Sequence, residues 1–166
     1  MPVLGKNASK AGGIVKDRRP TGFWVIFVFL AASIVLMLAG QTLGAFDYER
    51  AAQLGLQEDP EEMTQFGVQV NRAFGVGDTV VYLPLMMVST IGLWQRKRWS
   101  LLTTAAVFGI SIYWTVTVTF ILLFLPGVPG YTNVPGIEIW LFIGTYLVAG
   151  ALGLVYLIRR GDRLLD

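Results

Sequence analysis

Five polar side chains stand out in a chain that is 54% hydrophobic and only 14% charged. Four of them, Asn71, Arg72, Asp78 and Tyr82, fall in one short stretch, and Glu138 follows a segment rich in Pro and Gly. If one helix runs through the stretch, Asn71, Asp78 and Tyr82 share a face, because their spacing is close to whole helical turns. An amide, a guanidinium, a phenol and carboxylates can bind a cation, hold a polar ligand or transfer protons. We therefore predict that these five residues form a ligand-binding group.

The two acids could act together. Asp78 and Glu138 each lie just inside the predicted outer boundary of an apolar stretch. A carboxylate costs less there than the roughly 2.5–3.5 kcal/mol expected at the centre of a membrane. In a shared dry pocket one acid would stay protonated, whereas a cation such as Arg72 between them would let both ionise. The alternative is that each acid caps a helix and faces water.

The residue types that are missing narrow the chemistry further. The sequence contains no Cys and no His, which excludes disulfides, thiol catalysis, Cys or His metal sites and imidazole-bound haem. It also has neither a nucleophile elbow nor an Asp-rich metal motif. This favours a protein that is not an enzyme, with no metal and no identifiable cofactor, although a bound lipid or pigment is compatible.

Four apolar stretches must position these groups. Residues 23–46, 76–94, 101–125 and 137–158 each reach the roughly 20 residues that a helix needs to cross about 30 Å of hydrocarbon. The sequence therefore predicts an all-α integral membrane protein, in which residues 21–166 form a bundle of four transmembrane helices. Residues 1–20 are polar and basic, and we expect them to form a flexible cytoplasmic tail.

The basic residues predict how the chain is threaded. Eleven of the 13 lie in the amino terminus, in the connection between the second and third stretches, or in the carboxyl terminus. They are Lys6, Lys10, Lys16, Arg18, Arg19, Arg96, Lys97, Arg98, Arg159, Arg160 and Arg163. Because cytoplasmic segments are enriched in Lys and Arg, both termini should be cytoplasmic in a multi-pass protein of the plasma membrane, such as a prokaryotic inner membrane.

The connection at residues 47–75 should form an extracytoplasmic helical hairpin between the first and second spans. Asp47 is placed to cap a short helix that Gly55 ends. Asp59 followed by Pro60 is a typical start for a second helix, which would be amphipathic and extend to Phe74. The connection at residues 126–136 is rich in Pro and Gly and should be a loop.

Small and polar residues should mark the faces along which the spans pack, since lipid cannot satisfy hydroxyl or amide groups. Pro84 should kink the second span. Tyr113 and Trp114 lie near mid-membrane and are interpreted as packing or lipid-facing bulk, not as the wall of a ligand site. The packing candidates are Gly40 and Gly44 in the first span, Ser111 and Thr115 in the third, and Thr145 in the fourth. Gly40 and Gly44 could instead mediate homodimerisation.

In outline the arrangement resembles claudins and tetraspanins, but their outer cysteines are absent, so no family is assigned. The leading hypothesis is an accessory or partner-binding protein, a small subunit or assembly factor of a larger membrane complex. Its partners would be membrane lipids and either other membrane subunits or a second copy, but not nucleic acid, because the basic residues are dispersed. The first alternative is an oligomeric carrier or channel for a small solute or cation, with Asp78 and Glu138 as its site. The second is a membrane enzyme acting on a lipid or isoprenoid.

Overall fold

The computed structural model describes residues 19–132 and 134–165, and within these ranges it contains helices and no strand. The predicted basic tail lies outside the described residues except for Arg19 and Pro20. Four helical segments are long and apolar enough to cross a membrane, namely Thr21–Phe46, Gln65–Trp94, Trp99–Phe124 and Ile137–Leu164. The all-helical architecture and the four candidate spans are therefore confirmed.

The first two candidate spans are each built from three consecutive pieces. The first consists of α1 (Thr21–Met37), the π-helical stretch η1 (Leu38–Thr42) and α2 (Leu43–Phe46). The second consists of α4 (Gln65–Gly77), the π-helical stretch η3 (Asp78–Tyr82) and α5 (Leu83–Trp94). The other two are α6 (Trp99–Phe124) and α7 (Ile137–Arg160), and α7 is followed by a 3-10 turn, Gly161–Leu164. The short helix α3 (Tyr48–Gln53) follows the first span.

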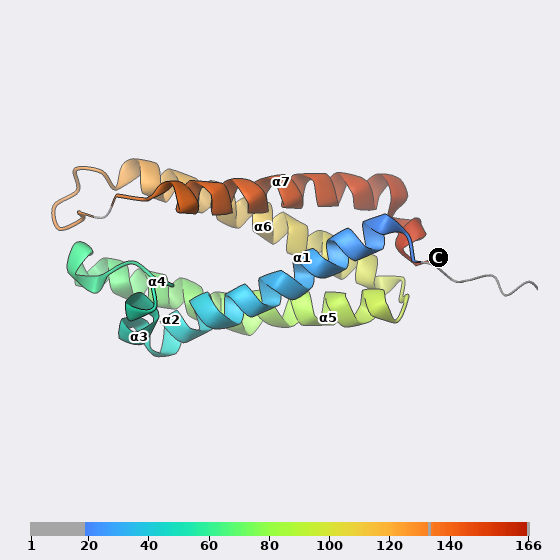
Figure 1. Cartoon of the computed structure of the whole chain (residues 1–166), viewed down its shortest axis with the longest axis horizontal. Helices are drawn as coiled ribbons and strands as arrows, with labels where there is room; N and C mark the ends of the chain where they lie inside the picture. The colour runs from blue at the N-terminus through green and yellow to red at the C-terminus, as the bar shows by residue number, and fades with distance from the viewer. Residues whose placement is uncertain (1–18, 133, 166) are drawn as a thin grey trace, which may run out of the picture.

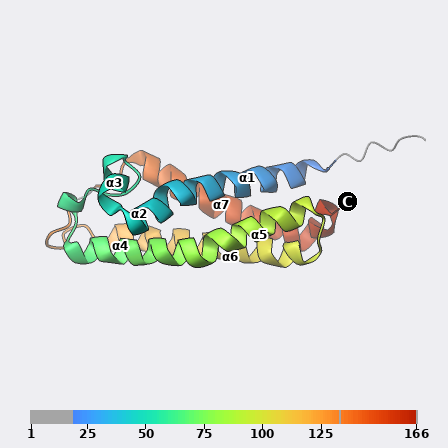
Figure 2. The ribbon, with the colours of Figure 1, turned by 90° about the horizontal axis from the view of Figure 1, so that it is seen from below.

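The helices form two groups that meet at one end and separate at the other (Figure 1). Helices α6 and α7 run side by side, and α1 crosses over one face of the bundle from the α5 side toward α7 (Figure 1 and Figure 2). The two groups meet at the end that holds the start of α1 and the carboxyl terminus, which we call the termini end. The opposite end carries α3 and is called the α3 end. The core follows α1, α5 and α6, and its largest fully buried apolar side chains are Phe23, Leu30, Met86, Leu93, Val107, Phe108 and, from the turn after α7, Leu164.

The connection after the first span is helical only in part. Asp47 caps α3 as predicted, since its carboxylate accepts from the backbone N–H of Arg50 at 3.2 Å. Asp59 also accepts from a backbone N–H, but it begins a single 3-10 turn, Pro60–Glu62, and the long helix predicted there is wrong. The long helix that does form here is α4, and its cap is Thr64, whose Oγ1 accepts from the N–H of Gly67 at 3.1 Å. The amphipathic helix is therefore the extension of the second span, with which it is continuous, and not a separate arm of a hairpin.

The π-helical stretches η1 and η3 pack against each other. The hydroxyls of Thr42 and Thr79 lie 3.0 Å apart across this contact. A Cβ added to Gly75 would come within 2.7 Å of the Gln41 carbonyl oxygen, so glycine is what permits the close approach. Where the sequence predicts a kink at Pro84, the structure has η3, which ends two residues before the proline. Proline supplies no N–H for a regular helical turn, and a change of helical register accommodates that loss.

The face of the second span that Asp78 and Tyr82 were predicted to share points inward. Gly75, Asp78, Tyr82, Met86 and Ser89 are all buried. Two predicted packing residues of α6 are also buried. Ser111 bonds to the Val107 carbonyl and to Tyr82, and Thr115 bonds to the Ser111 carbonyl at 2.8 Å.

Helix α7 buries a different face from the one predicted. Thr145, the predicted packing residue, is exposed, as are Glu138, Leu141 and Leu152, which share its face of the helix. The buried residues are Ile143, Tyr146, Gly150 and Leu157. Gly150 lies against the backbone of α6, because an added Cβ would approach the Phe108 carbonyl oxygen at 3.2 Å. Close approach through glycine therefore overrides the weak preference of a single threonine hydroxyl for the interior.

Candidate functional site

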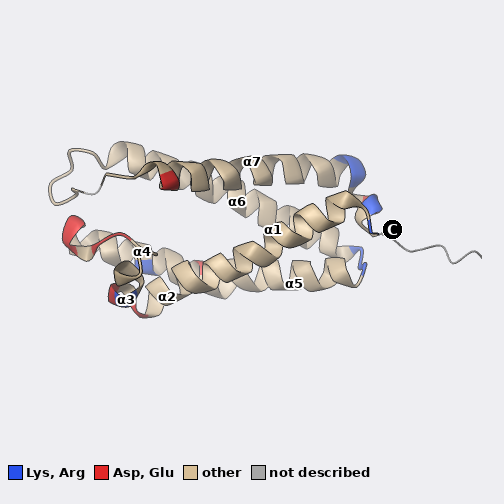
Figure 3. Ribbon diagram, in the orientation of Figure 1, with Lys and Arg blue, Asp and Glu red and all other residues tan. Residues whose placement is uncertain are grey.

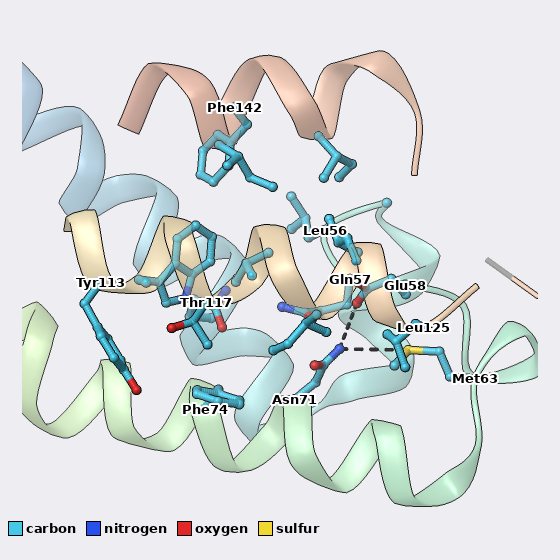
Figure 4. Close-up of a pocket in the computed structure, with 18 residues that line it drawn as sticks. Leu56, Gln57, Glu58, Met63, Asn71, Phe74, Tyr113, Thr117, Leu125 and Phe142 are labelled. Atoms are coloured by element: carbon cyan, nitrogen blue, oxygen red, sulfur yellow. Dashed lines mark hydrogen bonds between the residues drawn. The ribbon is translucent and has the colours of Figure 1, made fainter. Parts of the chain in front are cut away.

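A cavity of about 290 Å³ lies where the two helix groups separate. Its walls come from α4, α6 and α7, and the chain that follows α3 closes it at the α3 end (Figure 4). We call this cavity the cleft. Most of its lining is apolar and includes Phe74, Trp114, Val118, Ile121, Leu122, Leu125, Ile139, Phe142 and Ile143.

The carboxylate and amide groups of the cleft gather at the α3 end. They are those of Gln57, Glu58 and Asn71, with the thioether of Met63 beside them (Figure 4), together with Gln41. The hydroxyls of Tyr113 and Thr117 and the indole of Trp114 line the cleft farther along α6. The Asn71 amide donates to Glu58 Oε2 at 2.8 Å and lies 3.9 Å from the Met63 sulfur. The Gln57 amide donates to the Gly40 carbonyl oxygen at 3.2 Å. These bonds fasten the connection after α3 to α4 and to η1, and so fix the polar end of the cleft.

Two glycines allow the connection to fold onto the helices. Gly55 adopts a φ of +69°, which turns the chain directly after α3 and which other residues rarely adopt. Gly44 leaves room for the side chain of Gln57, because an added Cβ would lie 2.9 Å from its Cγ. Gly44 is therefore a packing residue inside the molecule, as one of its two predicted roles required. Gly40 contributes its carbonyl oxygen to the same contact.

Tyr48 contacts two residues of the polar end, Asn71 and Met63. Its hydroxyl accepts from the Asn71 amide at 3.3 Å and donates to the Met63 sulfur at 3.6 Å. Burial raises the pKa of Tyr48 above its ordinary value. The hydrogen bond from Asn71 opposes this rise in the pKa, whereas the negative charge of Glu58 adds to it.

The cleft is long, mainly apolar in its lining and open at its side. Its lining reaches from Tyr113 on α6 to Leu125 just after it, 12 positions apart, or about 18 Å at about 1.5 Å per residue. Tyr113 is 70% exposed and Phe74 is 44% exposed, so the lining reaches the lateral surface of the bundle. Trp114 packs edge-on against Phe142, with ring centroids 6.1 Å apart. With its carboxylate and amides at one end and a mainly apolar lining along the rest, the cleft has the character of a site for an amphiphile.

The five predicted ligand-binding residues lie in different places. Asn71 lines the cleft, whereas Tyr82 lies in the core with its hydroxyl 2.6 Å from Ser111 Oγ. Arg72 points away from the cleft, and its guanidinium donates to the Ala45 carbonyl at 3.2 Å and to the Gln69 amide oxygen at 3.4 Å. Asp78 is buried and borders a separate hollow on α4, while Glu138 is exposed at the start of α7. Asp78 and Glu138 line no common cavity in the described part of the chain.

Sequence reasoning missed several residues of the cleft. Tyr113 and Trp114 are part of its wall and not only packing or lipid-facing bulk. Their position away from the aromatic belts at the membrane surfaces was the available signal. Gln57 and Glu58 carried no signal, because they belong to an acidic connection whose contact with α4 depends on the fold.

Within the ranges that the structure describes, no group of three or more acidic residues is arranged to hold a metal ion. Comparison with protein-family models, with curated protein sequences and with solved structures finds no significant match. The functional argument therefore rests on the cleft and on the distribution of charge.

Proposed function

We propose that the chain is a multi-pass membrane protein with both termini in the cytoplasm. The four apolar helices support this, and so does the separation of charge, since Lys and Arg gather at the termini end and acids mainly at the α3 end (Figure 3). Arg50, on α3, and Arg72, on α4, are exceptions to this separation. By the preference of Lys and Arg for the cytoplasmic side, the α3 end faces outward.

We further propose that the protein binds one amphiphilic molecule from the outer leaflet in the cleft. One observation carries this, namely that the carboxylate and the amides of the cleft lie at the α3 end, while the rest of its lining is mainly apolar, with the hydroxyls of Thr117 and Tyr113, and opens sideways. One leaflet contributes about 15 Å of hydrocarbon, half of the membrane core, and the cleft extends over a similar length. A lipid could enter from the side without its head group leaving the interface.

The head group should carry a hydrogen-bond donor. The polar end offers the Glu58 carboxylate and the side-chain oxygens of Gln41, Gln57 and Asn71, and no Lys or Arg lines the cleft in the described part of the chain. A phosphate would meet a carboxylate without a compensating cation. A long-chain or isoprenoid alcohol or amine fits these groups better than a phospholipid.

The arrangement favours binding over chemistry or transport. Glu58, the acid of the cleft, is already bonded to Asn71, and neither Asp78 nor Glu138 borders the cleft. The carrier and enzyme alternatives assign their central role to Asp78 and Glu138, so they gain no support from this site. A small lipid-binding subunit that accompanies a larger membrane complex is the function that the geometry supports best.

The test is saturable binding of farnesol to purified protein in lipid nanodiscs. Val118→Trp should fill the cleft and weaken farnesol binding at least tenfold, because Val118 lines it. Val116→Trp is the matched control, since Val116 lies on the same helix, is exposed and does not line the cleft. Farnesyl phosphate should bind at least tenfold more weakly than farnesol, and Glu58→Gln should reduce that preference. Equal binding by the two tryptophan variants, or a preference for the phosphate, would contradict the proposal.

A further inference from the structure

A second hollow lies on the surface of α4, apart from the polar end of the cleft. It is lined by Val70, Ala73, Phe74, Gly77 and Asp78. Ala73 and Gly77 are exposed and four residues apart, and a Cβ added to Gly77 would meet no atom within 4 Å. Small residues at this spacing let a second helix approach the backbone closely. The spacing alone assigns nothing, and the argument depends on the acid at its edge.

Asp78 is only 8% exposed, and its Oδ2 has no hydrogen-bond partner among the described residues. The nearby donors are engaged elsewhere. Thr79 bonds to the Gly75 carbonyl at 2.7 Å, and the Tyr82 hydroxyl lies on Ser111. Arg72 is bonded to Ala45 and Gln69. A covered carboxyl with no partner marks a place where a group from outside this chain is expected.

The depth of Asp78 makes this lack of a partner costly. Asp78 lies 16 positions before Trp94, or about 24 Å along the helix at about 1.5 Å per residue. If Trp94 marks the inner interface, Asp78 lies about 6 Å inside the outer boundary of a core about 30 Å thick. Bulk water does not reach that depth, whereas the side chain of Lys or Arg on a neighbouring helix can.

We propose that the hollow is a docking site for a transmembrane helix of a partner protein that carries a Lys or Arg at this depth. The Ala73 and Gly77 groove would admit the backbone of that helix, and its cation would pair with Asp78. Charge complementarity argues against a second copy of this chain, because a two-fold contact through this surface would place two Asp78 side chains together with no cation. The proposal rests on the membrane insertion proposed above, but it is independent of the cleft.

A designed helix can test the proposal without knowledge of the natural partner. The probe is a synthetic Leu/Ala transmembrane peptide with one Lys about 6 Å inside the outer interface, and its control carries Leu at that position. Energy transfer between labelled protein and labelled peptide in liposomes measures their association. The Lys peptide should bind wild-type protein at least tenfold more tightly than the Leu peptide.

Two pairs of variants locate the contact. Asp78→Asn should abolish the preference for Lys, whereas Glu138→Gln should keep it, because Glu138 is an exposed acid on another helix. Gly77→Leu should weaken binding of both peptides, whereas Gly109→Leu, at another exposed glycine with open space around it, should not. Because Gly77 is unpacked in the folded chain, its replacement leaves the fold intact and the test valid.

Two outcomes would overturn the proposal. One is equal binding of the Lys and Leu peptides by wild-type protein. The other is energy transfer between two labelled copies of the chain that Gly77→Leu removes, because it would show that a second copy covers the hollow. Farnesol binding measured on the same variants separates this proposal from the cleft, since either result can fail while the other holds.

Discussion

Two buried Tyr–Ser hydrogen bonds join the helices, and we predict that they contribute unequally to the free energy of unfolding. Tyr146 donates from α7 to Ser33 Oγ on α1 at 2.9 Å, and the Tyr82 and Ser111 hydroxyls lie 2.6 Å apart between η3 and α6. Ser111 also bonds to the Val107 carbonyl of its own helix at 3.0 Å. Ser33 is 1% exposed and has no bond besides that from Tyr146 within the described residues.

Replacing each tyrosine by Phe should therefore have unequal effects on the free energy of unfolding. Tyr82→Phe loses one interhelical hydrogen bond, worth about 0.6 kcal/mol on average in a membrane protein. Tyr146→Phe loses a similar bond and leaves the Ser33 hydroxyl buried without a partner, which costs about 1–3 kcal/mol more. We expect a total near 2 kcal/mol for Tyr146→Phe, at least about 1 kcal/mol more than for Tyr82→Phe.

The assay is reversible unfolding in mixed micelles titrated with SDS, followed by circular dichroism. Tyr113→Phe is the control with no expected effect, because Tyr113 is exposed and has no hydrogen bond to another described residue. Ser33→Ala combined with Tyr146→Phe should recover most of the lost stability, since removing both partners leaves no orphaned group. A loss for Tyr82→Phe as large as that for Tyr146→Phe, or no recovery in the double variant, would refute the reasoning.

Three further predictions use the same unfolding assay. Gly75→Ala should destabilise the fold by about 1–3 kcal/mol, because its Cβ meets the Gln41 backbone, whereas Gly77→Ala should be neutral or stabilising; similar losses for both would contradict the η1–α4 contact. Tyr48 has a raised pKa when folded, so stability should be full below about pH 10 and fall as the pH rises through the folded pKa; Tyr48→Phe should flatten that fall. Arg19→Gln should cost about 1 kcal/mol, because the guanidinium bonds to the Leu93 and Trp94 carbonyls; an unchanged midpoint would show that Arg19 does not hold α1 to the end of α5.

The four apolar helices and the inward face of the second span could be predicted from the sequence. Both follow from one physical fact, that hydrocarbon does not solvate polar groups, and Asp78 and Tyr82 lie inside as this requires. The start of the long helix could not be predicted with the same certainty, because Asp59 and Thr64 both provide cap oxygens and the local sequence does not rank them.

The buried face of α7 and the cleft depend on information that no local pattern contains. Gly150 packs on α6 and Gly144 does not, although both are glycines in the same apolar helix. Glu58 joins the cleft only because Asn71 binds it across a gap of 13 residues. A sequence pattern identifies residues that prefer the interior, but it does not identify which elements meet there.

The stretches η1 and η3 have a consequence for the phase of the helices that contain them. Each π turn accommodates about one residue more than an α turn, so each acts as an insertion that the helix has absorbed. A regular α-helix over the same residues, without the wide turn, would rotate every later residue of α5 by about 100° about the axis. Met86 and Ser89 would then turn away from the core, while Asn71 stayed in place. The wide turn thus lets one continuous helix serve two interfaces, the cleft above it and the bundle core below.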